Sequence, residues 1–160
     1  MDELPEQLPA LPAHEDLPLF AEQLATHQTT ATVNATVLVI DAWAALGGTL
    51  WIGRGNERSC YLMAHVEDKG LWPVVFYPTG KCEVVFQYMA IRPPFDDVEL
   101  RREFLNRLNK IAGVDLPEAK LELRPGFGME LLTDAASRET FVDALTWFFH
   151  QANPAAAGSS

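Results

Sequence analysis

Apolar residues recur three and four positions apart in four segments of the chain, and this spacing predicts four helices. The segments are residues 17–27, residues 33–46, residues 96–111 and a last one that starts at Asp134 or Ser137 and ends at Gln151. The second segment is rich in Thr and Val, which also suit strands. Two glycines follow it, as they often follow helices, and they favour the helical interpretation.

The third of these segments has the clearest start and stop signals. Asp96 can cap the helix, and Glu99 three residues later completes a capping box. Phe95 can pack on Leu100 ahead of the first turn, and Gly113 fits the helix end. The residues expected in the core are Leu100, Phe104, Leu108 and Ile111, and those expected at the solvated surface are Arg101, Arg102, Glu103 and Arg107.

Four shorter segments, rich in valine and aromatic residues, predict strands at residues 49–53, 59–66, 71–77 and 82–89. The turn residues Pro-Thr-Gly-Lys between the last two predict a hairpin. Within the last strand, alternation places Phe86 on the better buried face. The order of elements predicts an α+β domain with an antiparallel meandering sheet of about four strands. Helices precede and follow this sheet and pack mainly on one of its faces.

The 160 residues are enough for one domain with a hydrophobic core. Residues 1–16 contain three prolines among acidic residues and single leucines, a composition that predicts a disordered acidic arm. Residues 17–152 form the predicted α+β domain. Residues 153–160, Asn-Pro-Ala-Ala-Ala-Gly-Ser-Ser, are expected to be a disordered tail.

The net charge of −10 is unevenly distributed along the chain. Residues 1–16 hold five acidic and no basic residues, which leaves −5 for residues 17–160. This balance does not favour direct nucleic-acid binding, and it argues against adsorption to an anionic membrane. There is no apolar stretch of membrane-spanning length and no signal-peptide pattern, so we expect a cytoplasmic protein.

The sequence offers few ligands for a metal or a cofactor. Its four histidines are far apart, and neither a phosphate-binding loop nor a dinucleotide-binding glycine pattern occurs. Cys60 and Cys82 fall in predicted strands, where lone cysteines are usually small core residues. We therefore expect no metal and no cofactor, and we assign no catalytic residue.

The best candidate for a binding surface is the segment from Trp51 to Gly55 and its continuation to Tyr61. Glycines on both sides of Arg54 allow a tight turn that lets the guanidinium project, with Trp51 and Tyr61 near enough to border it. An arginine beside aromatic rings can bind a carboxylate, a phosphate or a flat ring. Arg92, on a proline-rich linker next to Phe95, is the fourth candidate residue.

Two acidic-x-Lys triplets leave an enzymatic alternative open. Glu67 with Lys69, or Glu118 with Lys120, could serve a nuclease that uses a divalent metal, in which carboxylates hold the ion and lysine assists the water. Such short triplets arise readily in an acidic chain. A second alternative is an acidic inhibitor that imitates DNA, which needs carboxylates spaced along one folded face.

Several short motifs follow one another in a fixed order and carry a resemblance. They are Trp51-Ile52-Gly53-Arg54-Gly55, Gly80-Lys81-Cys82-Glu83-Val84-Val85-Phe86-Gln87, Pro93-Pro94-Phe95-Asp96, Arg107-Leu108-Asn109 with Gly113-Val114-Asp115-Leu116-Pro117, and Arg124-Pro125. In this order they resemble a family of uncharacterised bacterial domains, over about residues 17–150. After the first motif members often have Gly-Ser-Phe, whereas this chain has Arg58-Ser59-Cys60-Tyr61, which leaves the role of Ser59 and its neighbours open. The resemblance implies no established activity, and it associates the chain with nucleases or defence genes.

These observations together favour a non-enzymatic cytoplasmic domain that binds a protein partner or a small ligand. The resemblance adds that the domain is an accessory to a bacterial nucleic-acid-processing or defence system. The expected contact surface is the open sheet face around Trp51, Arg54 and Tyr61.

Overall fold

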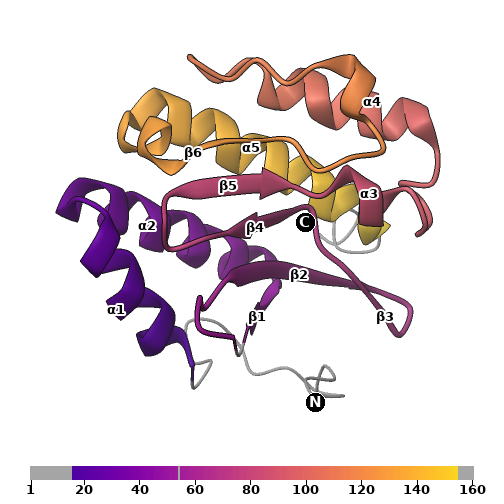
Figure 1. Ribbon diagram of the computed structural model, residues 1–160. Helices are drawn as coiled ribbons and strands as arrows, with labels where there is room; N and C mark the ends of the chain where they lie inside the picture. The colour runs from indigo at the N-terminus through magenta and orange to yellow at the C-terminus, as the bar shows by residue number, and fades with distance from the viewer. Residues whose placement is uncertain (1–15, 54, 155–160) are drawn as a thin grey trace.

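The structure is a computed structural model that describes residues 16–53 and 55–154. It confirms the expected α+β class (Figure 1). The helices are α1 Leu17–His27, α2 Thr30–Leu46, α3 Phe86–Met89, α4 Val98–Leu108 and α5 Ala135–Ala152, with short 3-10 helices η1 Glu118–Lys120 and η2 Met129–Thr133. The strands are β1 Thr49–Ile52, β2 Cys60–Val66, β3 Lys69–Leu71, β4 Val74–Phe76, β5 Lys81–Val84 and β6 Gly126–Gly128. The described residues thus hold more strands than the four expected.

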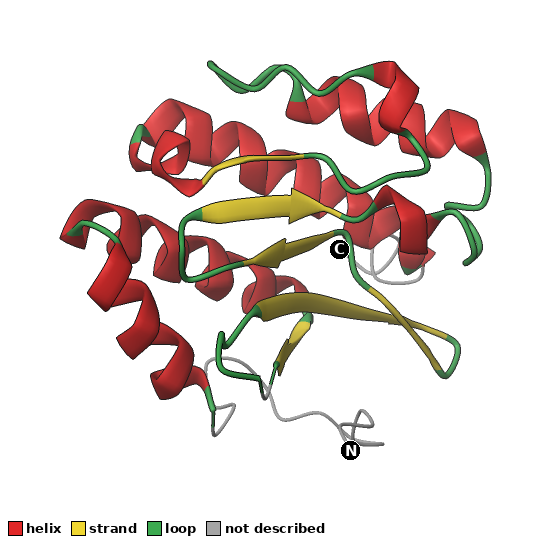
Figure 2. Cartoon of the chain, viewed as in Figure 1, coloured by secondary structure: helices red, strands yellow, loops and turns green. Residues whose placement is uncertain are grey.

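The strands form one antiparallel sheet in the order β1-β2-β4-β5-β6, and β3 pairs with the far part of β2 as an extended hairpin (Figure 2). Partners in register across an antiparallel pair point to the same face. One such row of partners is Ile52, Cys60, Phe76, Cys82 and Phe127. All five are buried, so this row forms the side of the sheet that faces the core.

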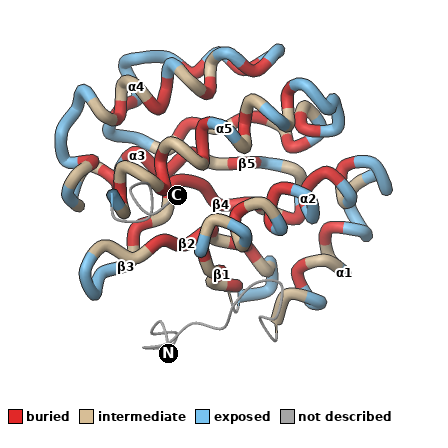
Figure 3. The backbone as a smooth tube through the Cα atoms, turned by 180° about the vertical axis from the view of Figure 1, so that it is seen from behind, coloured by how far each residue is buried: buried red, intermediate tan, exposed pale blue. Residues whose placement is uncertain are grey.

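Helices α2 and α5 cover the core side of the sheet, as the view from behind shows (Figure 3). The Phe141 ring of α5 lies 6.3 Å from the ring of Phe76 and 5.7 Å from that of Phe127. The indole of Trp43 in α2 donates from Nε1 to the Thr49 carbonyl and to the Met63 carbonyl, each at 3.1 Å. These contacts join the two helices to opposite halves of the sheet.

The predicted helices are largely confirmed. Helix α1 has the expected bounds, and α5 begins after Asp134, whose carboxylate accepts from the Ser137 backbone N–H at 2.9 Å. Helix α2 starts three residues earlier than expected, because the Thr29 hydroxyl caps it by accepting from the Thr32 N–H at 3.1 Å. No helix in residues 16–53 and 55–154 is long and apolar enough to cross a membrane.

Two strand predictions are wrong in part. The expected strand at residues 71–77 is interrupted at Trp72 and Pro73, which separate β3 from β4. The expected strand at residues 82–89 ends at Val84, because its partner β6 is preceded by Pro125, and the chain then turns into α3. Phe86 is buried as expected, but it faces the core from a helix rather than from a strand.

The expected start of the third helix is off by one residue, and one of its arginines is misplaced. Asp97, not Asp96, caps α4, because its carboxylate accepts from the Glu99 N–H at 2.9 Å. Arg101, expected at the surface, is only 4% exposed. Its guanidinium donates to the carbonyls of Leu121 at 2.9 Å, Phe95 at 2.8 Å and Asp96 at 3.2 Å. This single side chain therefore holds α4 to two connecting segments.

We expect Arg101→Ala to lower the free energy of unfolding by about 3 kcal/mol, because three carbonyls lose a charged donor in a buried place. Arg101→Lys should recover only part of this loss, since one ammonium cannot replace the planar fork. Denaturant unfolding measures both. Arg102→Ala, on the exposed side of the same helix, is the matched control and should change stability far less; equal losses for the two alanine variants would contradict the role of Arg101.

Candidate binding face of the sheet

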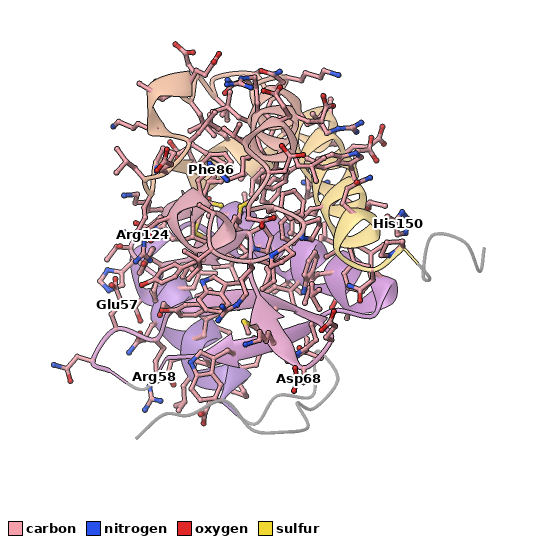
Figure 4. The ribbon with its side chains drawn as sticks, turned by 90° about the vertical axis from the view of Figure 1, so that its right-hand side faces the viewer. Glu57, Arg58, Asp68, Phe86, Arg124 and His150 are labelled. Atoms are coloured by element: carbon pink, nitrogen blue, oxygen red, sulfur yellow. The ribbon has the colours of Figure 1, made fainter. Side chains whose placement is uncertain are left out.

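The sheet has a second face, opposite α2 and α5, which turns toward the viewer in Figure 1. Its central row runs in register across five strands: Trp51, Tyr61, Val75, Glu83 and Gly126. The tyrosine, the tryptophan and the glutamate of this row are partly exposed, whereas Val75 in its middle is buried. Figure 4 shows Arg124 beside this face and His150 of α5 on the opposite side of the molecule. We refer to this row with Trp72, Tyr77, Tyr88 and Arg124 as the open face.

A line of aromatic rings crosses the open face. The Tyr61 and Trp72 rings are 5.9 Å apart at 70°, and the Trp72 and Tyr88 rings are 5.3 Å apart at 40°. The guanidinium of Arg124 lies 5.2 Å from the centre of the Tyr88 ring, a cation–π distance. These residues come from β2, from the connection between β3 and β4, from α3, and from the segment before β6. The two interruptions of the predicted strands are therefore the places that supply Trp72 and Tyr88.

Glu83 organises the polar end of the face. Its Oε1 accepts from Arg124 Nη2 at 2.6 Å and from Nε at 3.0 Å, and from the Tyr77 hydroxyl at 2.8 Å. Burial lowers the pKa of the Arg124 guanidinium, but the bonds to Glu83 outweigh this effect and the pKa is raised. Burial and the Glu83 carboxylate raise the pKa of the Tyr77 phenol well above its ordinary value. At neutral pH this cluster is an ion pair plus a neutral phenol, and it fixes Arg124 over Tyr88.

A small hollow lies at the α3 end of the open face. It is lined by Gly70, Leu71, Trp72, Tyr88, Ile91 and Arg92. Arg92 donates from Nε to the Gly70 carbonyl at 3.3 Å, and among the described residues no carboxylate lies within ion-pair distance of it. The buried indole N–H of Trp72 likewise has no acceptor among them. The hollow thus combines an arginine that has no carboxylate partner in the described part of the chain with the exposed side chain of Ile91, whereas the Trp72 N–H is buried and out of reach of a ligand.

The four binding candidates of the sequence are not all brought together. Trp51 and Tyr61 form a cross-strand pair on the open face, as expected for neighbours in a hairpin. Arg92 lies farther along that face, in the hollow with Trp72. Arg54 lies outside the described residues, as do the acidic residues 1–15 and the tail residues 155–160.

Gly53, the first glycine of the hairpin that carries Trp51, is required by close packing against Ser59. A Cβ on Gly53 would lie 2.8 Å from the Ser59 hydroxyl, and the Gly53 N–H donates to the Ser59 carbonyl at 2.8 Å. Ser59 is therefore part of the hairpin closure, which accounts for its burial. Gln23 of α1 supports the same loop by donating to the Asn56 carbonyl at 2.8 Å.

The two triplets of the nuclease alternative lie in different elements of the fold. Glu67 is in the turn between β2 and β3 with a left-handed φ of 61°, and Lys69 starts β3. Glu118 and Lys120 belong to η1, where Glu118 pairs with Arg102 of α4 at 3.0 Å. In residues 16–53 and 55–154 no three His, Cys, Asp or Glu side chains gather as a metal site.

The cysteines are core residues, as predicted. Cys60 and Cys82 are both partners of Phe76, on the two sides of β4, so a whole strand separates them. Both are fully buried, and burial raises the pKa of each thiol. A buried thiol with a raised pKa is a poor nucleophile.

Neither protein families, curated proteins nor solved structures show a match to this chain. The resemblance to bacterial domains therefore stays an expectation.

Sequence reasoning missed five residues of the open face: Trp72, Tyr77, Glu83, Tyr88 and Arg124. Trp72 stands directly before Pro73, a pair that indicates a strand break and an aromatic residue released from regular alternation. Glu83 and Arg124 are both in motifs that carry the resemblance, but 41 positions separate them, so their ion pair needed the fold.

We expect Glu83→Gln to lower the Tyr77 pKa part of the way to its ordinary value, because burial remains when the carboxylate is removed. Since the folded pKa is raised, the stabilisation from Tyr77 is present below about pH 10 and is lost as the pH rises through the folded value. Ultraviolet absorbance of tyrosinate during alkaline titration measures the shift. Tyr77→Phe identifies the late-titrating phenol, and identical titrations of Glu83→Gln and the unmodified chain would contradict the assignment.

Proposed function

We propose that this chain is a non-enzymatic recognition domain whose open face binds an extended segment of a partner protein. The observation that carries the proposal is the continuous line from Tyr61 through Trp72 to Tyr88, which continues in Trp51 across the strand pair. Trp, Tyr and Arg are the residues that most often dominate binding energy at protein interfaces. Here all three types lie on one sheet face.

The dimensions of the open face suit a short extended peptide. Five strands lie side by side, and four spacings of about 4.8 Å give a width of about 19 Å. A segment that rises about 3.1 Å per residue crosses this width in about six residues. Rings fixed by neighbouring contacts lose little conformational freedom on binding, which favours affinity.

The electrostatics of the face favour a peptide over a nucleic acid. Aromatic rings on an open sheet can stack on bases, but binding to the backbone also needs cations for the phosphates. Arg124, the cation over the Tyr88 ring, is already paired with Glu83. Arg92 has no carboxylate partner within the described part of the chain, and one such arginine suits a carboxylate of a peptide.

We expect Tyr88→Ala to reduce recovery of the partner about tenfold in affinity capture from host cells, because it removes the ring that packs between Trp72 and the Arg124 guanidinium. The resemblance points to bacterial nucleic-acid-processing or defence proteins as the partners to look for. Leu38→Ala is the matched control, since Leu38 is 51% exposed on α2, which covers the other face. Equal recovery by Tyr88→Ala and Leu38→Ala would contradict the proposed face.

Titration of the unmodified chain and of Tyr88→Ala with single-stranded DNA and RNA oligonucleotides tests whether the open face binds nucleic acid instead of a peptide. We expect no quenching of tryptophan fluorescence at moderate salt. Quenching that Tyr88→Ala abolishes would show that the face binds bases, and it would replace the peptide proposal.

A further inference from the structure

The sequence before α1 has the pattern of a ligand for an aromatic face. Leu-Pro pairs stand at residues 4–5, 8–9 and 11–12, and residues 9–12 read Pro-Ala-Leu-Pro. A polyproline II helix has three residues per turn, so Pro9 and Pro12 would share one side. Segments with this Pro-x-x-Pro spacing bind grooves lined by aromatic rings, because their shape is set before binding and costs little entropy.

The open face offers the matching surface. Its neighbouring rings are inclined by 70° and 40° instead of lying in parallel stacks, so their faces do not cover one another. Proline rings can pack against such faces. A polyproline II helix has no internal hydrogen bonds, so its carbonyls can accept from side-chain donors, and the Arg92 guanidinium has no carboxylate partner among the described residues.

Charge and reach agree with this pairing. Acidic residues Glu3 and Glu6 flank the first Leu-Pro pair, and Arg92 of the hollow has no carboxylate partner among the described residues. Helix α1 begins at Leu17, and its Gln23 is bonded to the loop that follows β1, so the first turns of α1 lie near the β1 edge of the sheet (Figure 1). Fifteen residues in polyproline II conformation reach about 46 Å, more than twice the width of the face.

We infer that residues 4–12 of this chain bind its own open face and compete there with the partner. This inference rests on the proposed function, because it names the ligand class of the same surface: a proline-rich acidic segment. A tethered segment reaches an effective concentration in the millimolar range, so even a weak contact is populated. A partner must then displace the chain's own segment, which makes the domain self-inhibited.

A spin label on the full-length chain tests the contact. Ala10→Cys provides one reactive thiol, because Cys60 and Cys82 are fully buried. The indole N–H signals of the four tryptophans are then compared with the label oxidised and reduced. We expect Trp51 and Trp72, on the open face, to lose most of their intensity. Trp43 and Trp147, which pack on the helical side, should lose less.

The control is the same labelled chain with Pro9→Ala and Pro12→Ala. This variant should restore the Trp51 and Trp72 signals, because it lacks the Pro-x-x-Pro pattern but keeps the spin label and all acidic residues. Unchanged broadening in this variant, or equal effects at all four indoles, would overturn the inference. Broadening of an isotope-labelled chain by a separate spin-labelled chain would overturn the intramolecular form, since the segment would then act between copies.

The outcome is independent of the partner experiment. If the label leaves Trp51 and Trp72 unaffected while Tyr88→Ala still loses the partner, only the inference about residues 4–12 falls. If Tyr88→Ala retains the partner, the proposed function falls, whatever the label shows.

Discussion

The antiparallel register of the sheet determines which of its side chains are buried in the core and which lie on the open face. Because partners in register share a face, the row from Ile52 to Phe127 is buried against α5, and the adjacent row from Trp51 to Gly126 points the other way. A shift of one residue in a strand would turn the side chains of that strand to the opposite face. In β5 it would bury Glu83, and in β4 it would expose Phe76. The core therefore fixes the register, and the register fixes the open face.

The same dependence explains why four helices could be predicted to within three residues from the sequence and the ends of two strands could not. Helix starts are local: Thr29, Asp97 and Asp134 each satisfy a backbone N–H two or three residues away. The end of β5 depends on Pro125, which lies about 40 positions later in the chain and is brought beside it only by folding. The alternation of side chains from Cys82 through Phe86 predicted a longer strand, because no residue within this segment indicates where the strand ends.

Arg101 and the open face show the same limit for side chains. Spacing on α4 placed Arg101 among charged surface neighbours, and only the approach of residues 95–96 and 121 makes it a buried donor to three carbonyls. Likewise, Trp51 and Tyr61 could be predicted as neighbours because a short hairpin joins them, whereas Glu83 and Arg124 could not. The Asn109 side chain is an intermediate case, since it both donates to and accepts from the backbone of Leu116, seven positions away.

A chain that carries a ligand for its own binding face has a tunable affinity for its partner. When the face is free for only a tenth of the time, the apparent Kd for any competitor rises about tenfold. Because the segment is tethered, its effective concentration at the open face does not depend on the concentration of the protein. Occupancy by the partner, in contrast, rises with the partner's concentration. Substitutions in residues 4–12 would then change the apparent Kd for the partner without altering the sheet. The described core of the domain lies entirely between Phe20 and Ala152. The uneven charge of the sequence fits this division, because Glu3 and Glu6 stand beside or within the segment proposed to meet Arg92, and residues 17–160 carry only −5 of the net charge of −10.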